Sequence, residues 1–193
     1  MEIFHLLVVV MIGVVLLTLP GPTAGDEELE RHWAQLKKEG DAYMVEIAQK
    51  ESVIRLKSGV MVEIMKTSTK KEPLSPAPHG KCHMELIGTL RDGTEIQAKI
   101  VHEFSVEGLV DGLQQTVQYM VEGDRWKVYV PYKLAYGDMG RLAYGNKGHD
   151  VPPYSPMIFE VEIIAFVNAN AGKSAAAARR DFERAKVKQQ EEL

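Results

Sequence analysis

The central part of the chain alternates apolar and polar side chains with a period of two, which predicts β-strands. In "SGVMVEIMKT", Val60, Val62 and Ile64 are expected to face one way and the residues between them the other. The stretches "KCHMELIGTL", "RWKVYVP" and "PMIFEVEIIAF" continue this pattern. Asp92-Gly93 in "RDGTEI" predicts a tight hairpin between two of the strands. Together these stretches predict an antiparallel sheet.

One helical stretch, "LVDGLQQTVQYMVEGD", interrupts the strands. Leu113, Val117 and Met120 are spaced so that they share one face of a helix, and Gly123 is expected to end it. Several strands around one short helix predict an α+β fold, in which the antiparallel sheet wraps across that helix.

A second helix, an N-terminal helical arm, is predicted over residues 26–50. Its acidic start suits the positive end of a helix dipole. Leu29, Trp33 and Leu36 lie at helical spacing, and Gly40 is expected to interrupt the stripe. Such a modest apolar stripe indicates an arm that docks on its own domain.

Two polar stretches are expected to be solvated. The proline-rich link "KEPLSPAPHG", with Pro73, Pro76 and Pro78, resembles either a polyproline ligand or a loop, and its composition favours the loop. The C-terminal tail, residues 169–193, is rich in Ala, Arg, Glu and Lys and predicts a charged helix. Phe182 is its single aromatic residue, so we expect the tail to bury little surface.

Residues 1–25 contain an uncharged apolar run over residues 6–19. About 14 residues are too short to cross the ~30 Å hydrocarbon core and suit the apolar region of a signal peptide. Thr23 and Gly25 would place cleavage before Asp26. The first five residues hold no Lys or Arg, so an uncleaved membrane anchor and a buried helix stay open as alternatives.

Length and charge limit the remaining possibilities. The chain has 193 residues, enough for one core domain, here residues 51–168, with extensions at both ends. Its formal net charge is −4, which does not provide the basic surface that nucleic-acid binding needs. The single cysteine, Cys82, excludes an internal disulfide.

The cluster "HGKCH" superficially suggests a metal site, because His79, Cys82 and His83 are close together in sequence. Structural zinc sites take four ligands, and catalytic ones take three with water. The second cysteine of a C-x-x-C pair is missing here. We therefore expect no metal and no cofactor.

Four motifs in a fixed order identify a family resemblance. They have the forms M-x-x-G-D-x-W, P-x-x-L-A-Y-G, V-P-P and M-x-F-x-V-E-I, and they stand at residues 120–126, 131–137, 151–153 and 157–163. In this order they resemble FKBP-type peptidyl-prolyl isomerases, most closely the macrophage-infectivity-potentiator (Mip-like) branch. The resemblance covers about residues 56–166. It implies an FKBP-like fold, binding of proline-containing peptides or client proteins, and isomerisation of X–Pro bonds.

The letters LAYG occur twice, at residues 134–137 and 142–145. Family members place a proline shortly before this motif, and the first copy has it as Pro131. The first copy is therefore interpreted as the pocket copy, and the second as an eight-residue duplication that lengthens the loop before Val151. Tyr144 of the second copy either lies at the pocket rim or faces solvent, and solvent is favoured.

The resemblance also assigns roles to residues. The Tyr136 hydroxyl would donate to a bound peptide carbonyl, the Val110 N–H would hold the neighbouring carbonyl, and Phe159 would complete the catalytic set. Taken alone, Phe104 and Phe159 would be interpreted as ordinary core residues; the motifs favour a pocket. Its lining would be formed by Phe104, Leu109, Leu113, Val151, Met157, Leu86 and Ile96.

Three positions depart from the family pattern. Leu86 stands where a tyrosine is usual, Ile96-Gln97 where Phe-Asp is usual, and Leu113 where a tryptophan lies under the proline ring. These replacements argue against full turnover and against macrolide binding. Two functions stay open: an isomerase of reduced activity, and a non-catalytic FKBP-like chaperone or peptide-binding module.

The signal-like segment predicts the secretory pathway (ER lumen or secreted), with membrane contact only if that segment is uncleaved.

Overall fold

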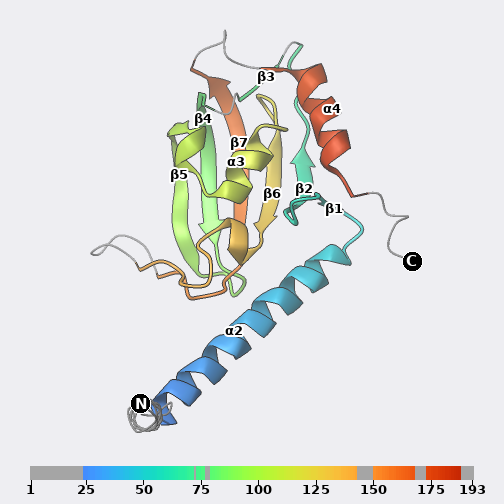
Figure 1. Cartoon of the computed structure of the whole chain (residues 1–193). Helices are drawn as coiled ribbons and strands as arrows, with labels where there is room; N and C mark the ends of the chain where they lie inside the picture. The colour runs from blue at the N-terminus through green and yellow to red at the C-terminus, as the bar shows by residue number, and fades with distance from the viewer. Residues whose placement is uncertain (1–23, 72, 77–78, 143–149, 168–172, 188–193) are drawn as a thin grey trace, which may run out of the picture. The chain divides into compact units, whose positions relative to one another are not determined.

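The computed structural model describes residues 24–71, 73–76, 79–142, 150–167 and 173–187 (Figure 1). The chain divides into two compact units, Met1–Gln35 and Leu36–Leu193. Of the first unit, only residues 24–35 are described, as the beginning of helix α2 (Ala24–Ala48). The predicted signal segment lies outside the described residues apart from its last two positions. No helix within these ranges is long and apolar enough to span a bilayer.

The second unit is built on a six-stranded sheet with the order β1-β2-β6-β7-β4-β5 (Figure 1). Every neighbouring pair of these strands is antiparallel. The strands are β1 (Val53–Arg55), β2 (Met61–Lys66), β4 (Lys81–Thr89), β5 (Glu95–Ser105), β6 (Arg125–Val130) and β7 (Met157–Phe166). The predicted α+β class with an antiparallel sheet is confirmed.

Helix α3 (Asp111–Val117) lies across one face of the sheet (Figure 1). Leu113, Val117 and Met120 are buried, as their spacing predicted, and they belong to the main core beneath the helix. The predicted helix end at Gly123 is wrong, because the helix already ends at Val117. Gly123 instead has φ +92° and lies in the turn before β6, where its N–H donates to the carbonyl of Ile163.

The C-terminal half of α2 covers part of the opposite face of the sheet. Tyr43, Met44 and Ile47 of α2 pack in a second core with residues of four strands: Val53, Met61, Tyr129 and Ile158. Simple alternation therefore fails in β2, where the adjacent Met61 and Val62 are both buried while Ile64 is 39% exposed. A strand buried on both faces loses its period-two pattern.

Helix α2 runs through Gly40 without a break, in agreement with the single helix predicted over residues 26–50. Gly40 approaches the backbone of Tyr154 so closely that an added Cβ would lie 2.5 Å from the Tyr154 carbonyl oxygen. The glycine therefore permits a close approach of helix and loop, and the helix tolerates it at a cost of about 1 kcal/mol.

The proline-rich link is not simply a solvated loop. Pro73, Ser75 and Pro76 are buried, and the link forms strand β3 (Leu74–Ser75), which pairs with β8 (Lys173–Ser174). The Ser75 hydroxyl donates to the Gln118 carbonyl at 2.7 Å. Pro78 lies outside the described residues. The buried part of the link therefore ties the segment after α3 to the tail.

The C-terminal tail forms helix α4 (Ala175–Ala185), with Ser174 as its N-cap. The expectation that this helix is solvated is wrong, because Phe182 is 6% exposed and packs in the main core. Its ring centroid lies 4.9 Å from that of Trp126 and 5.9 Å from that of Tyr119. One aromatic residue, rather than a long apolar stripe, anchors the helix.

Candidate peptide-binding site

The structure brings all ten predicted site residues into one cluster, the main core. Six of them are buried: Leu86, Ile96, Leu113, Val151, Met157 and Phe159. The other four pack against these and stay partly exposed: Phe104, Leu109, Val110 and Tyr136. These four residues are therefore the ones of the predicted set that a ligand could contact without entering the core.

The sheet positions the deeper members of this site. Leu86 lies on β4, Ile96 and Phe104 on β5, and Phe159 on β7. Phe159 pairs across the ladder with Gly88, where an added Cβ would lie 3.1 Å from the Phe159 ring. The ring thus occupies the space that a side chain at position 88 would need.

Tyr136 is held by a turn that follows β6. Pro131 precedes the 3-10 helix η2 (Tyr132–Leu134), and the N–H of Gly137 donates to the Tyr132 carbonyl at 2.8 Å. Gly137 has φ +69°, a conformation that glycine adopts at no steric cost. The N–H of Tyr154 in turn donates to the Gly137 carbonyl at 3.2 Å. Hydrogen bonds on both sides therefore fix the main chain next to Tyr136.

The two LAYG copies differ in their surroundings. Leu134, Ala135 and Tyr136 of the first copy pack against the main core. Leu142, which begins the second copy, is 83% exposed. Tyr144 lies outside the described residues, so its two alternatives stay predictions. Of the side chains that the structure describes, those of the first copy are the ones in contact with the site.

Val110 is the residue before α3, with φ −63° and ψ 149°. Its carbonyl accepts hydrogen bonds from the N–H groups of Leu113 and Gln114, at 2.9 and 3.0 Å. Its own N–H donates to no acceptor among the described residues. A backbone donor at the edge of an apolar cluster is suited to hold a peptide carbonyl.

Sequence reasoning missed Arg141. Its guanidinium carbon lies 5.0 Å from the centroid of the Tyr136 ring, a cation–π distance. The residue stands just before the second LAYG copy and forms an isolated β-bridge with Val151. A single charge in a polar, glycine-bearing loop gave no periodic signal by which it could have been found.

The residues of the superficially metal-like cluster, His79, Cys82 and His83, lie in different surroundings. Cys82 points into the core and is fully buried, whereas His83, the next residue on β4, is exposed. His79 pairs instead with Glu107. No group of His, Cys, Asp or Glu that could hold a metal ion occurs in the described ranges. Burial raises the pKa of the Cys82 thiol to about 11, so the thiolate that metals bind is disfavoured.

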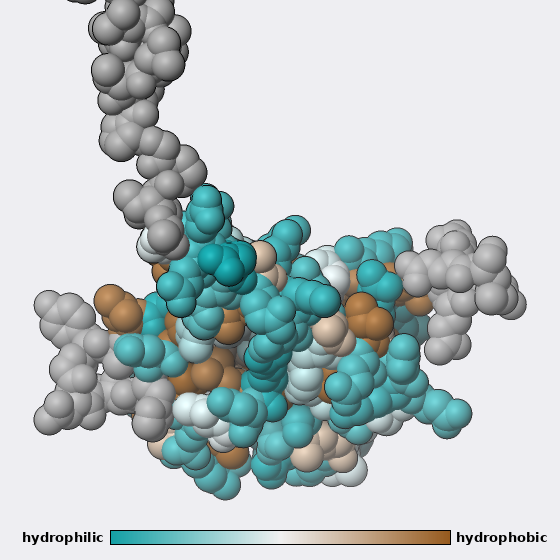
Figure 2. All heavy atoms as spheres, turned by 90° about the horizontal axis from the view of Figure 1, so that it is seen from below, coloured by the Kyte–Doolittle hydropathy of each residue, from teal (hydrophilic) through white to brown (hydrophobic). Residues whose placement is uncertain are grey.

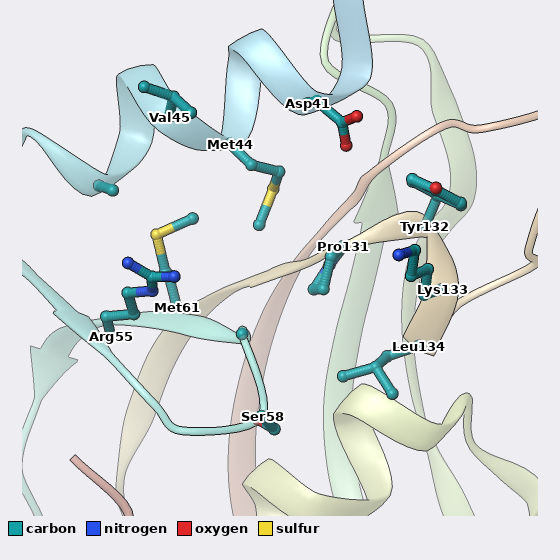
Figure 3. Close-up of a pocket in the computed structure, with 12 residues that line it drawn as sticks. Asp41, Met44, Val45, Arg55, Ser58, Met61, Pro131, Tyr132, Lys133 and Leu134 are labelled. Carbon is teal, nitrogen blue, oxygen red and sulfur yellow. The ribbon is translucent and has the colours of Figure 1, made fainter. Parts of the chain in front are cut away.

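A separate hollow of about 440 Å³ lies among α2, the β1–β2 turn and η2 (Figure 3). Met44, Met61, Pro131 and Leu134 contribute apolar walls, and Asp41 lies at its edge (Figure 3). None of the ten predicted site residues lines it. Viewed from below, exposed apolar residues are interspersed with hydrophilic ones (Figure 2).

Residues 72–164 match the family model described as FKBP-type peptidyl-prolyl cis-trans isomerase. A Trypanosoma cruzi protein named macrophage infectivity potentiator is 32% identical over 162 residues, 82% of this chain and 78% of that protein. The FKBP-type 22 kDa peptidyl-prolyl cis-trans isomerase of Escherichia coli is 29% identical, covering 72% of this chain and 65% of that protein. The outer membrane protein MIP of Legionella longbeachae is 27% identical, and the match covers 74% of this chain and 59% of that protein.

Solved structures resemble the fold. A peptidyl-prolyl cis-trans isomerase from Pseudomonas syringae superposes with a TM-score of 0.60 at 24% identity, covering 70% of this chain and 96% of that one. FkpA from Escherichia coli gives the same TM-score at 22% identity, and the match covers 72% of this chain and 63% of that chain. At these identities the superpositions establish the fold alone.

Proposed function

The chain belongs to the FKBP-type peptidyl-prolyl cis-trans isomerase family and is Mip-like, and from this premise we propose that the apolar cluster around Tyr136 is its active site. The observation that supports this most strongly is that ten residues from distant parts of the sequence meet in one cluster, in which Tyr136, Val110, Phe104 and Leu109 stay partly exposed. The substrate is the X–Pro bond of a peptide or client protein.

An apolar site suits this reaction. Rotation about a peptide bond must cross about 18–20 kcal/mol, because the planar amide is stabilised by resonance. The twisted transition state loses that resonance and its charge separation, so a water-poor cavity favours it over the planar ground state. Neither a nucleophile nor a metal is required. The protein has to bind the proline ring and orient the carbonyls beside it.

Two donors orient the peptide in this proposal. The Tyr136 hydroxyl donates to one peptide carbonyl, and the Val110 N–H, which has no acceptor among the described residues, donates to the next. The turn around Gly137 fixes the main chain beside Tyr136, and the start of α3 fixes the Val110 N–H. Such preorganisation reduces the entropy lost on binding. Phe159, Phe104 and Val151 then contact the proline ring.

The wall of the site is aliphatic where family enzymes have aromatic rings. Leu86, Ile96 and Leu113 are all buried, so they supply apolar surface but lack a ring face for the proline. We therefore expect turnover below that of members with a full aromatic set, and weak macrolide binding.

The alternative function is a non-catalytic chaperone or peptide-binding module. Gln97 favours it, because family enzymes carry a carboxylate at this position. The Gln97 side-chain amide donates to the backbone carbonyl of Ala98, so this side chain is engaged locally. In this alternative, the apolar cluster without that carboxylate binds a proline but does not lower the rotation barrier.

Cis/trans exchange of a Leu-Pro peptide, measured with and without the purified chain, tests the function. The wild type should accelerate exchange, and Tyr136→Phe should lower kcat/KM by about threefold to tenfold, the loss expected for one hydrogen bond. Leu113→Trp should raise activity if its larger ring is accommodated at the base of the site. Exchange at the spontaneous rate with wild-type protein would reject the enzyme and favour the binding module.

We further propose that the clients are secretory-pathway proteins, reached after cleavage of the apolar leader. The support is the apolar run at residues 6–19 and the small residues Thr23 and Gly25. Sequencing the amino terminus of the mature protein tests this. Asp26 as the first residue would agree with cleavage, whereas Met1 would favour the anchor.

A further inference from the structure

Arg141 lies between two residues of the proposed site. Its N–H donates to the Val151 carbonyl at 2.8 Å, and its carbonyl accepts from the Val151 N–H at 2.7 Å. The guanidinium carbon lies 5.0 Å from the Tyr136 ring centroid. The two backbone bonds fix the main chain of Arg141, so the side chain is held over the tyrosine that we propose binds substrate.

The Nε of Arg141 is a buried donor without an acceptor in the part of the chain that the structure describes. Buried donors of this kind are uncommon, because they lose their hydrogen bonds to water without replacement. The guanidinium also forms no ion pair with a described carboxylate. Asp138, the nearest acid in sequence, is exposed.

We propose that Arg141 is a substrate-binding residue, whose Nε–H donates to an acceptor of the bound peptide and whose charge selects an acidic side chain before the proline. This inference rests on the proposed function of the Tyr136 site. A bound peptide would supply the acceptor that the free protein lacks. Because the guanidinium stays charged at all physiological pH values, it attracts a neighbouring carboxylate and repels an ammonium group.

The position of Arg141 makes this selection effective. The residue is only partly exposed and lies against an apolar ring. Charges interact more strongly there than in open water, where solvent screens them. The preference should therefore depend on the residue next to the proline, with Glu bound better than Gln or Leu, and Lys bound worst.

Four peptides that differ only in the residue before proline, Glu, Gln, Leu or Lys, test the proposal. Each is studied with wild type, Arg141→Gln, Arg141→Lys and the control Arg179→Gln, which removes the same charge from an exposed position on α4. Exchange spectroscopy gives kcat/KM, and titration of amide chemical shifts gives Kd. Wild type should favour Glu over Lys by about two- to fivefold.

Arg141→Gln should bring the Glu-to-Lys ratio close to one and weaken binding of all four peptides by about two- to tenfold. Arg141→Lys should keep the charge preference, and Arg179→Gln should match wild type. An unchanged ratio in Arg141→Gln would overturn the inference, and so would an equal effect of Arg179→Gln, since net charge would then explain it. Absence of catalysis with wild type would reject the isomerase function alone, because the Kd values still decide the role of Arg141.

Discussion

Cys82 illustrates how burial sets the chemistry of a single residue. It lies on β4 inside the main core, and burial raises the pKa of its thiol from the ordinary 9.0 to about 11. The folded protein therefore retains this proton at pH values where the unfolded chain has released it. Stability linked to Cys82 is complete below about pH 9 and is lost as pH rises toward 11.

This linkage predicts the behaviour of Cys82→Ala. Urea unfolding at pH 8 and pH 10.5 should show that wild type loses on the order of 1–2 kcal/mol more stability than the variant between the two values. At pH 8, native wild type should also react slowly with a thiol reagent, because little thiolate is present and the sulfur is buried. If both proteins lost the same stability between the two pH values, and the thiol of the native wild type reacted rapidly, Cys82 would not be a buried thiol with a raised pKa.

At the residue scale, sequence motifs predicted ten site residues, which the structure brings into one cluster, but they did not point to Arg141. Leu113, Met157 and Phe159 follow from periodicity and from ordered motifs. Arg141 forms a β-bridge with Val151, and its guanidinium lies over the Tyr136 ring. No local sequence pattern encodes that contact. Loop conformations depend on long-range packing, so such residues are found only in the structure.

At the scale of elements, substitutions in helix α4 test how much the C-terminal tail contributes to the stability of the domain. Phe182→Ala should destabilise the protein by about 3–5 kcal/mol, since the ring packs between Tyr119 and Trp126. Arg180→Ala, at an exposed position of the same helix, should change stability by less than about 0.5 kcal/mol. Urea unfolding distinguishes the two. Equal, small effects would mean that α4 does not stabilise the domain.

Helix α2 provides a second test, because Gly40 lies against the loop that carries Tyr154. Gly40→Ala gains about 1 kcal/mol in helix propensity, yet its Cβ would lie 2.5 Å from the Tyr154 carbonyl oxygen. We expect a lower Tm and reduced isomerase activity, since Tyr154 also bonds the backbone beside Tyr136. Val45→Ala, at a position that is 61% exposed, is the control. A variant as stable as this control would show that the close approach is unimportant.

The strands and hairpin were predictable, because alternation reports directly which side of a strand is buried. Prediction failed where a second element covers the outer face, as α2 does at Met61, and where one residue anchors a polar segment, as Phe182 does. Helix α3 was predicted too long, because the residues after Val117 stay apolar in a turn that packs on the core. In each case tertiary contacts override the local pattern.

For the whole molecule, the central question is where a proline peptide binds. Among the described residues, two candidates are the cluster around Tyr136 and the 440 Å³ hollow bounded by Met44, Met61 and Leu134. The first has a partly exposed tyrosine, Tyr136, and a backbone donor, the Val110 N–H, without an acceptor among the described residues. The second has none of the residues that the family resemblance assigns to binding.

Amide chemical-shift mapping with a Leu-Pro peptide separates these alternatives most directly. The account predicts that the largest changes fall at Leu109, Val110, Tyr136 and Val151, and that Tyr136→Phe weakens the same titration. Changes confined to Met44, Met61 and Leu134, with the Tyr136 cluster unaffected, would contradict it.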